Sequence, residues 1–304
     1  MWRLERVGDG LIMQPRPHVP WEQSAVLNAA AVYDPNVGRG RFHLLYRAVA
    51  HRPGDPNRSS IGYAWSDDGI HFERLDEPVL RSNEMPEEAQ GVEDPRVTKL
   101  GDTYYMLYTA YDLHRIQIAM ASSKDLLTWR RHGVVIPNTL FGSNKDGALF
   151  PETFGGRYCI MHRPEPDIYL GFSDDLSNWT ERATHVRIMQ PEFAWESAKI
   201  GGGAQPIKTE KGWLIIYHGV DERLWYRLGV ALLDLDDPTR VIARQPEPIL
   251  EPEKDWELIG DVHNVVFTCG AVLVGRELRV YYGAADTVIG VAKGNIDDFL
   301  NTIA

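Results

Sequence analysis

The sequence predicts an all-β protein and, within that class, a five-bladed β-propeller. Three observations lead to this prediction: a β-rich pattern recurs five times, each copy carries a tight polar turn, and helical periodicity is nearly absent. Repeats that can each form a small antiparallel sheet are typical of blades stacked around a central axis. An irregular sandwich would not explain the repeated turn chemistry.

Each repeat contains an apolar strand, a second strand and a polar turn. The first strands begin at residues 42, 104, 158, 213 and 279, so consecutive units start 62, 54, 55 and 66 residues apart. The turns read SDDG, SKDL, SDDL, LDDP and NIDD, and such residues favour tight turns. The predicted pairs of segments are 42–49 with 61–72, 104–112 with 116–129, 158–165 with 168–179, 213–220 with 226–241, and 279–286 with 288–299.

Composition and cysteine usage bound the organisation of the chain. Its 304 residues are 43% hydrophobic and 25% charged without a linker-like stretch, which predicts a single domain over residues 1–304. Cys159 and Cys269 lie in apolar runs and are expected to be buried free thiols, as in a reducing compartment. Residues 1–17 lack the apolar core of a signal peptide, and no run approaches a membrane span. We therefore expect a cytoplasmic protein without membrane contact.

The net charge narrows the choice of partners. The chain has 32 Lys and Arg against 43 Asp and Glu, a formal net charge of −11. An acidic protein repels polyanions, so nucleic acid is not expected as a partner. Any anion that this chain binds must be held by a local cluster of basic side chains.

Motifs for several common chemistries are missing. The sequence contains no GxxxxGK[ST], GxGxxG, HExxH, CxxC pair or GxSxG, so nucleotide, zinc-protease and serine-hydrolase functions have no support. The Asp-containing turns carry too few ligands for calcium, and we predict no metal site. Carboxylates, cations and amides remain, together with 9 Trp, 13 Tyr and 9 Phe. This combination suits a sugar, because aromatic rings can cover its C–H face.

In a propeller, residues that are far apart in the sequence converge at the axis. Polar residues that follow the apolar strands of the five units are therefore candidates for one shared site, since concave sites collect polar groups. These candidates are Arg47, Asp112, Arg163, His218 and Asp286.

The segment 91–96 (GVEDPR) supplies a further candidate. Pro95 restricts the residue before it, so we expect Asp94 to be extended and to project its carboxyl in a defined direction. A carboxyl at a strand mouth, with Arg96 two residues on, is a plausible proton donor. The same residues could instead form a solvated turn in which Asp94 and Arg96 pair.

Longer segments point to one known family. They are GVEDPRVTKLGDTYYMLYTAYD, KDGALFPE, MHRPE, WESAKIGGGAQPI, GWLIIYHGV, LLDLDDP, NVVFTCGAV and YYGAAD, between about residues 28 and 290. These segments resemble glycoside hydrolase family 130, which comprises β-mannoside phosphorylases and some β-mannosidases. The resemblance implies a five-bladed propeller that cleaves a β-mannosidic bond with inversion. Inorganic phosphate would be the nucleophile and co-substrate, α-mannose 1-phosphate the product, and no cofactor is implied.

The resemblance and the charge pattern together give the predicted site residues. Asp94 is the implied catalytic acid, working through the 3-hydroxyl of the mannose. Phosphate is assigned to Arg47, Arg163, Lys199, His218 and Tyr226, and the sugar to Asn28, Arg96, Lys145, Asp146 and Asp286. An inverting hydrolase needs a carboxylate base for water, whereas phosphate is already an anionic nucleophile. A second carboxylate beside phosphate would repel it, so we expect cations opposite Asp94.

Two alternatives stay open. A β-mannosidase of the same fold would need a second carboxylate, for which Glu192 and Glu196 are candidates. A propeller without activity would only bind glycans or proteins in its funnel. The sequence leaves the linkage (β-1,2 or β-1,4) and the acceptor sugar open, because these depend on segments such as 51–60 and 81–91. Since family members often assemble into larger oligomers, a homo-oligomer is compatible with the sequence.

Overall fold

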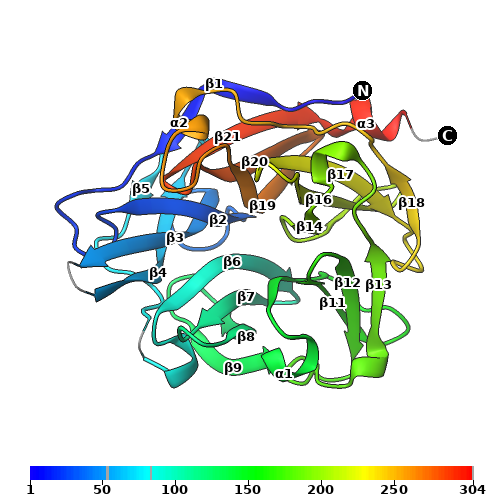
Figure 1. The fold of residues 1–304 in the computed structure, drawn as a ribbon, viewed down its shortest axis with the longest axis horizontal. Helices are drawn as coiled ribbons and strands as arrows, with labels where there is room; N and C mark the ends of the chain where they lie inside the picture. The colour runs from blue at the N-terminus through cyan, green and yellow to red at the C-terminus, as the bar shows by residue number, and fades with distance from the viewer. Residues whose placement is uncertain (53–54, 83, 303–304) are drawn as a thin grey trace.

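The strands form five blades around a central axis (Figure 1). This computed structural model describes residues 1–52, 55–82 and 84–302. The innermost strands β2, β6, β10 and β14 contact one another in succession, and β19 contacts β2 on one side and β16 and β17 of the fourth blade on the other. The predicted five-bladed β-propeller is confirmed.

Within each blade, neighbouring strands pair antiparallel. From the axis outward, the first blade contains β2 (Ala25–Tyr33), β3 (Phe42–Arg52), β4 (Asp55–Ser66) and β5 (Glu73–Arg74), and the second contains β6 (Gly91–Leu100), β7 (Thr103–Tyr111), β8 (Ile116–Ser123) and β9 (Arg130–Ile136). The third blade contains β10 (Asn144–Leu149), β11 (Tyr158–Pro164), β12 (Ile168–Ser173) and β13 (His185–Met189), and the fourth contains β14 (Lys199–Gly202) and β15 (Ile207–Lys208), then β16 (Trp213–Val220), β17 (Tyr226–Leu233) and β18 (Val241–Arg244). The fifth blade contains β19 (Val266–Val274), β20 (Glu277–Ala284), β21 (Val288–Asn295) and β1 (Glu5–Met13).

The helices are short and lie in the connections between strands, except α3, which follows the last strand. They are the α-helices α1 (Asn138–Phe141), α2 (Asp255–Leu258) and α3 (Ile296–Leu300), and the 3-10 helices η1 (Pro86–Glu88), η2 (Arg182–Thr184) and η3 (Ala194–Glu196). No helix within the described ranges is long and apolar enough to cross a membrane.

The N-terminal strand closes the ring. β1 pairs antiparallel with β21, with Glu5 opposite Lys293, so the first strand of the chain completes the last blade. Figure 1 shows β1 beside β21 and both termini on the same side of the molecule. This pairing covers an edge of β21 that would otherwise expose unpaired backbone groups.

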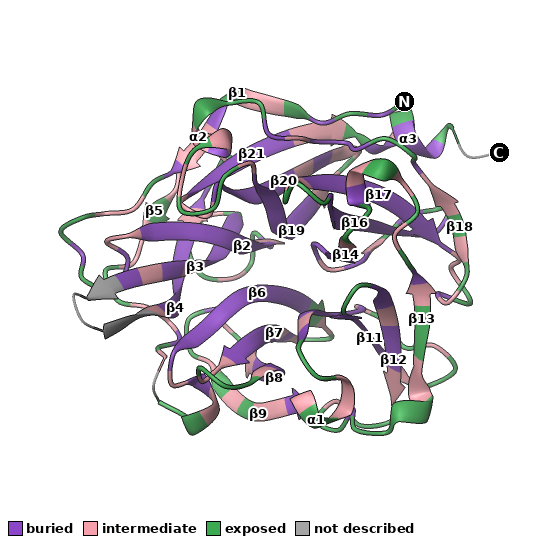
Figure 2. Cartoon of the chain, viewed as in Figure 1, coloured by how far each residue is buried: buried purple, intermediate pink, exposed green. Residues whose placement is uncertain are grey.

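The five predicted apolar strands correspond to β3, β7, β11, β16 and β20, which are second from the axis. They read as continuous apolar runs because both of their faces are buried between blades. In β16, Trp213 and Ile215 pack with residues of the third blade, whereas Leu214 and Ile216 pack with residues of the fifth. Burial is greatest in the inner strands and falls toward the outer ones (Figure 2).

A buried glutamate anchors the segment that leads into the innermost strand in four blades; it lies three residues before the strand in three of them and nine residues before β19 in the fifth. Each glutamate lies near a tyrosine from the second strand and bonds an arginine from the outermost strand. The four sets are Glu22 with Tyr46 and Arg74, Glu88 with Tyr108 and Arg131, Glu196 with Tyr217 and Arg244, and Glu257 with Tyr282 and Arg6. In the third blade, His162 and His185 take the tyrosine and arginine places, with their ring nitrogens 2.8 Å apart. We call the four sets the Glu–Tyr–Arg anchors.

The structure also places the two cysteines and the two segments that were expected to set specificity. Cys159 and Cys269 are free and buried, as predicted. The predicted specificity segment 51–60 falls largely in the β3–β4 hairpin, and 81–91 includes η1. Residues 53–54 and 83 of these segments lie outside the described residues.

Candidate active site

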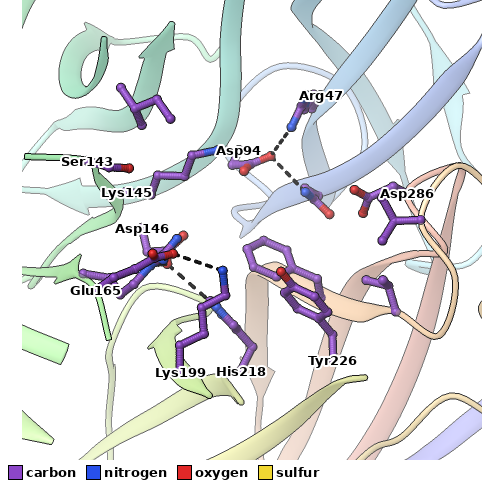
Figure 3. A pocket seen from close by; sticks show the side chains of 16 residues that line it. Arg47, Asp94, Ser143, Lys145, Asp146, Glu165, Lys199, His218, Tyr226 and Asp286 are labelled. Atoms are coloured by element: carbon purple, nitrogen blue, oxygen red, sulfur yellow. Dashed lines mark hydrogen bonds and ion pairs between the residues drawn. The ribbon is translucent and has the colours of Figure 1, made fainter. Parts of the chain in front are cut away.

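A pocket of about 270 Å³ opens at the propeller axis. Its lining includes the predicted site residues Asn28, Arg47, Asp94, Lys145, Asp146, Arg163, Lys199, His218, Tyr226 and Asp286. All five blades contribute, so the convergence predicted from the repeats is observed (Figure 3).

Three innermost strands carry a bulge that turns a polar residue into the pocket. Asn28, Asp94 and Asp146 have φ values of 49°, 52° and 63°, and the pairing register is interrupted at each of them. Bulges of this kind re-aim a side chain and are common beside active sites. The expectation that Pro95 holds Asp94 extended is therefore wrong, because the bulge places Asp94 in the left-handed region.

Asp94 is buried on one side of the pocket. Its Oδ1 accepts hydrogen bonds from Asn28 Nδ2 at 2.9 Å and from Arg47 Nη1 at 3.2 Å. Burial alone would raise the pKa of Asp94, but the charges of Arg47 and Lys145 and the Asn28 bond lower it below the usual value. The carboxyl is therefore ionised while the pocket is empty.

Arg47 lies on the Asp94 side, where it also donates to Glu93 Oε1 at 2.9 Å. Figure 3 shows it across the pocket from Lys199 and His218. Arg47 thus lies apart from the other predicted phosphate residues, and its guanidinium bonds the Glu93 and Asp94 carboxylates; its assignment to phosphate stays a prediction.

Arg163 and Lys199 form the cationic side, together with the carboxylate of Glu165. Arg163 Nε donates to Asp146 Oδ2 at 2.9 Å, and its Nη1 donates to Glu165. Lys199 Nζ donates to the same Glu165 oxygen at 3.0 Å. The expectation of cations opposite Asp94 holds, but the expectation that no carboxylate lies beside them is wrong.

His218 is buried between Tyr226 and Phe267, whose ring centroids lie 6.0 and 4.6 Å from its own. Burial lowers the pKa of His218 to about 3, and the Arg163 charge adds to this lowering, although Asp146 opposes it. His218 is therefore a neutral donor or acceptor and not the cation we expected. Its Nδ1 has no protein partner among the described residues, so a ligand could bond it.

Gly201 is required for this placement of His218. A Cβ on Gly201 would lie 2.4 Å from His218 Cε1 and 2.5 Å from Asp146 Oδ2. The glycine run of the segment AKIGGG therefore lets β14 pass close to the histidine ring.

Arg96 lies behind the pocket wall, which corrects its assignment to the sugar. Its guanidinium is 1% exposed and donates to Asp146 Oδ1 at 3.0 Å and to the carbonyls of Gly202 and Gly203. Arg96 thus ties β6 to β14 and fixes Asp146. Its role is structural positioning.

Asp112 lies in the β7–β8 turn, where it accepts bonds from the backbone and side chain of Arg115. Arg47, Arg163 and His218 each directly follow the second-strand anchor residue, and the equivalent residue of the second blade is Thr109. The proposal of Asp112 as an axial residue was wrong because it missed this register.

Asp286 lines the pocket from the β20–β21 turn, where Ala285 and Asp286 both have positive φ. Burial raises the pKa of Asp286 to about 6, and the Asp94 charge adds to the rise although Arg47 opposes it. Asp286 can therefore exchange a proton near neutral pH.

The sequence reasoning missed several lining residues. They are Ile116, Ser143, Glu165, Val262, Val265 and Phe267. Glu165 lies inside the quoted segment MHRPE, and Val265 and Phe267 lie inside NVVFTCGAV, so their neighbours could have pointed to them. The remaining residues carry no sequence signal that marks an axial position.

A five-bladed propeller that sets an acid across an axial pocket from arginine and lysine has the composition of a carbohydrate-active enzyme that handles an anion. The chain belongs to glycoside hydrolase family 130: the family model described as beta-1,4-mannooligosaccharide phosphorylase matches residues 11–304.

Curated relatives carry more specific names. The chain is 52% identical to a beta-1,2-mannobiose phosphorylase and 49% identical to a 1,2-beta-oligomannan phosphorylase, both from Thermoanaerobacter sp. (strain X514). Each match covers 96% of this chain and 97% of the relative. Among solved structures, the beta-1,2-mannobiose phosphorylase from Listeria innocua, in complex with beta-1,2-mannobiose, has a TM-score of 0.86 at 30% identity over 99% of both chains.

Proposed function

We propose that this protein is an inverting β-mannoside phosphorylase that cleaves a short β-1,2-linked manno-oligosaccharide with inorganic phosphate, giving α-mannose 1-phosphate. The observation that carries the proposal is the two-sided pocket, with buried Asp94 facing Arg163, Lys199 and His218. The β-1,2 linkage is taken from the two relatives at 49% and 52% identity.

In this proposal, Asp94 donates a proton to the leaving oxygen through the mannose 3-hydroxyl. Asn28 and Arg47 both bond Oδ1, so the proton is expected on Oδ2. Arriving phosphate adds negative charge to the pocket, which raises the pKa of Asp94 toward the value that an acid needs. Arg163, Lys199, His218 and Tyr226 hold the phosphate, while Lys145, Asp146 and Asp286 face the mannose.

The two candidate bases of the hydrolase alternative do not lie in the axial pocket. Glu196 is fully buried and bonds Arg244, while Glu192 lies 3.3 Å from the same arginine. Neither lines the axial pocket. A carboxylate that activates water must reach the reacting carbon, so these residues do not support hydrolysis.

Product analysis tests the proposed function. The protein is incubated with β-1,2-mannobiose or β-1,4-mannobiose, with and without phosphate, and mannose 1-phosphate and free mannose are quantified. We expect phosphate-dependent mannose 1-phosphate from the β-1,2 substrate, and mannose in equal amount from the acceptor. Release of mannose from both sugar units without phosphate would identify a hydrolase.

Replacement of the acid tests catalysis against simple glycan binding. Asp94→Asn should lower kcat at least a thousandfold, because the amide cannot donate the proton, while thermal unfolding stays cooperative. A propeller that only binds glycans would show no turnover in either protein, and retained turnover in the variant would refute the role of Asp94.

We further propose that residues 1–304 act as one catalytic domain. A cytoplasmic location stays a prediction, which the buried free cysteines support because free thiols persist in a reducing compartment. Assembly into a homo-oligomer also stays a prediction.

A further inference from the structure

The carboxylate of Glu165 bonds two of the cationic side chains to which phosphate is assigned. It directly follows β11, and its Oε1 accepts hydrogen bonds from both Arg163 Nη1 and Lys199 Nζ. The Glu165 side chain is 50% exposed, whereas that of Arg163 is 9% exposed. One half-exposed carboxylate thus pairs with two positively charged side chains of the pocket.

We propose that Glu165 is an exchangeable counter-ion: it holds Arg163 and Lys199 while the site is empty and turns toward solvent when phosphate displaces it. This inference rests on the proposed function and adds a residue that sets phosphate affinity. A carboxylate and a phosphate held by the same two cations would repel each other, so only one of them can occupy this position.

The surrounding contacts allow the exchange. Arg163 keeps its Nε bond to the buried carboxylate of Asp146 at 2.9 Å when its Nη1 is released, so the guanidinium stays in place. Because Glu165 is half exposed, water can solvate its carboxylate after it leaves.

Phosphate can also make a bond that Glu165 leaves unmade. His218 lines the same pocket, is 1% exposed, and has no protein partner for Nδ1 among the described residues. A tetrahedral oxyanion has enough oxygens to contact Arg163, Lys199 and His218 together. The return of Glu165 to the cations would then help to release the anionic sugar phosphate.

Charge removal at Glu165 tests the inference. Phosphate binding is measured by calorimetry on the wild type, Glu165→Gln and Glu152→Gln, and the rise in Tm with added phosphate gives a second readout. Glu152 is a matched control, because it forms a half-exposed pair with Lys208 at 2.6 Å outside the pocket.

We expect Glu165→Gln to bind phosphate at least threefold more tightly, with a larger phosphate-dependent rise in Tm, and Glu152→Gln to match the wild type. Equal or weaker phosphate binding by Glu165→Gln would overturn the inference, because Glu165 would then orient Lys199 and not compete for it. Loss of sugar cleavage with unchanged phosphate binding would also overturn it. If the wild type itself bound no phosphate, the proposed function would fail, and the inference with it.

Discussion

Asp94 and Asp286 line the same pocket, yet their surroundings move their pKa values in opposite directions. The Asp94 carboxylate accepts bonds from Asn28 and Arg47, which hold its pKa below the usual value. Asp286 is buried near the Asp94 charge, and its pKa rises to about 6. Position within the pocket therefore sets the order in which the two carboxyls ionise as the pH rises: Asp94 first, and Asp286 near pH 6.

The raised pKa of Asp286 predicts a pH-dependent cost to stability. Its folded-state pKa of about 6 lies above the unfolded value, so its contribution favours folding at low pH and is lost as the pH rises through 6. Asp286→Asn should therefore stabilise the protein at pH 8 by roughly 2–3 kcal/mol, and by almost nothing at pH 4. Thermal melts at both pH values measure this difference.

A matched control for that variant is the exposed Asp236. Asp236→Asn should leave Tm within error of the wild type at both pH values. A destabilised Asp286→Asn at pH 8 would show that the carboxylate is held favourably by Arg47. The stabilised variant should also lose activity, as expected where a site residue is placed for function at the expense of stability.

At the scale of elements, the innermost strands present the site residues, and the anchors fix the segments that lead into these strands. The bulges in β2, β6 and β10 present Asn28, Asp94 and Asp146 to the axis. The Glu–Tyr–Arg anchors fix the segments that lead into β2, β6, β14 and β19. Arg47, Thr109 and His218 directly follow the tyrosines of three anchors, and Arg163 follows His162 in the third blade, so these residues occupy equivalent positions in their strands.

Glu257 provides a test of the anchors. It is fully buried and accepts bonds from Arg6 Nη2 at 2.7 Å, from Tyr282 at 2.8 Å and from the backbone amides of the two residues before α2. Glu257→Gln should cost about 3 kcal/mol, because Arg6 loses its buried counter-charge and keeps only the exposed carboxylate of Glu253. Denaturant unfolding measures this cost, and Glu152→Gln, which breaks an exposed pair, should cost less than about 1 kcal/mol. Equal effects of the two variants would show that the anchor adds no more stability than an exposed ion pair.

The sequence was most informative where the chemistry is local. The apolar strands could be predicted because burial on both faces leaves continuous apolar runs, as in residues 213–220. The anchors were missed although Trp–Glu recurs at residues 21–22, 195–196 and 256–257, because the partners of each glutamate come from other strands. The bulge at Asp94 and the burial of Arg96 depend on pairing and on distant carbonyls, so local patterns could not reveal them.

At the scale of the whole molecule, the ring brings together residues that are up to 258 positions apart, from Asn28 to Asp286. It also separates two chemical tasks: the first, second and fifth blades, with Lys145 of the third, surround Asp94, while the third and fourth supply Arg163, Lys199 and His218 (Figure 3). An acid on one side and an anion on the other fit a single displacement with inversion.

The anomeric configuration of the first product tests this account most directly. NMR of the reaction between β-1,2-mannobiose and phosphate, recorded during the first turnovers, distinguishes α- from β-mannose 1-phosphate. We predict the α anomer, because phosphate attacks from the face opposite the leaving sugar. The β anomer would contradict the account, since retention requires a carboxylate nucleophile and two successive displacements.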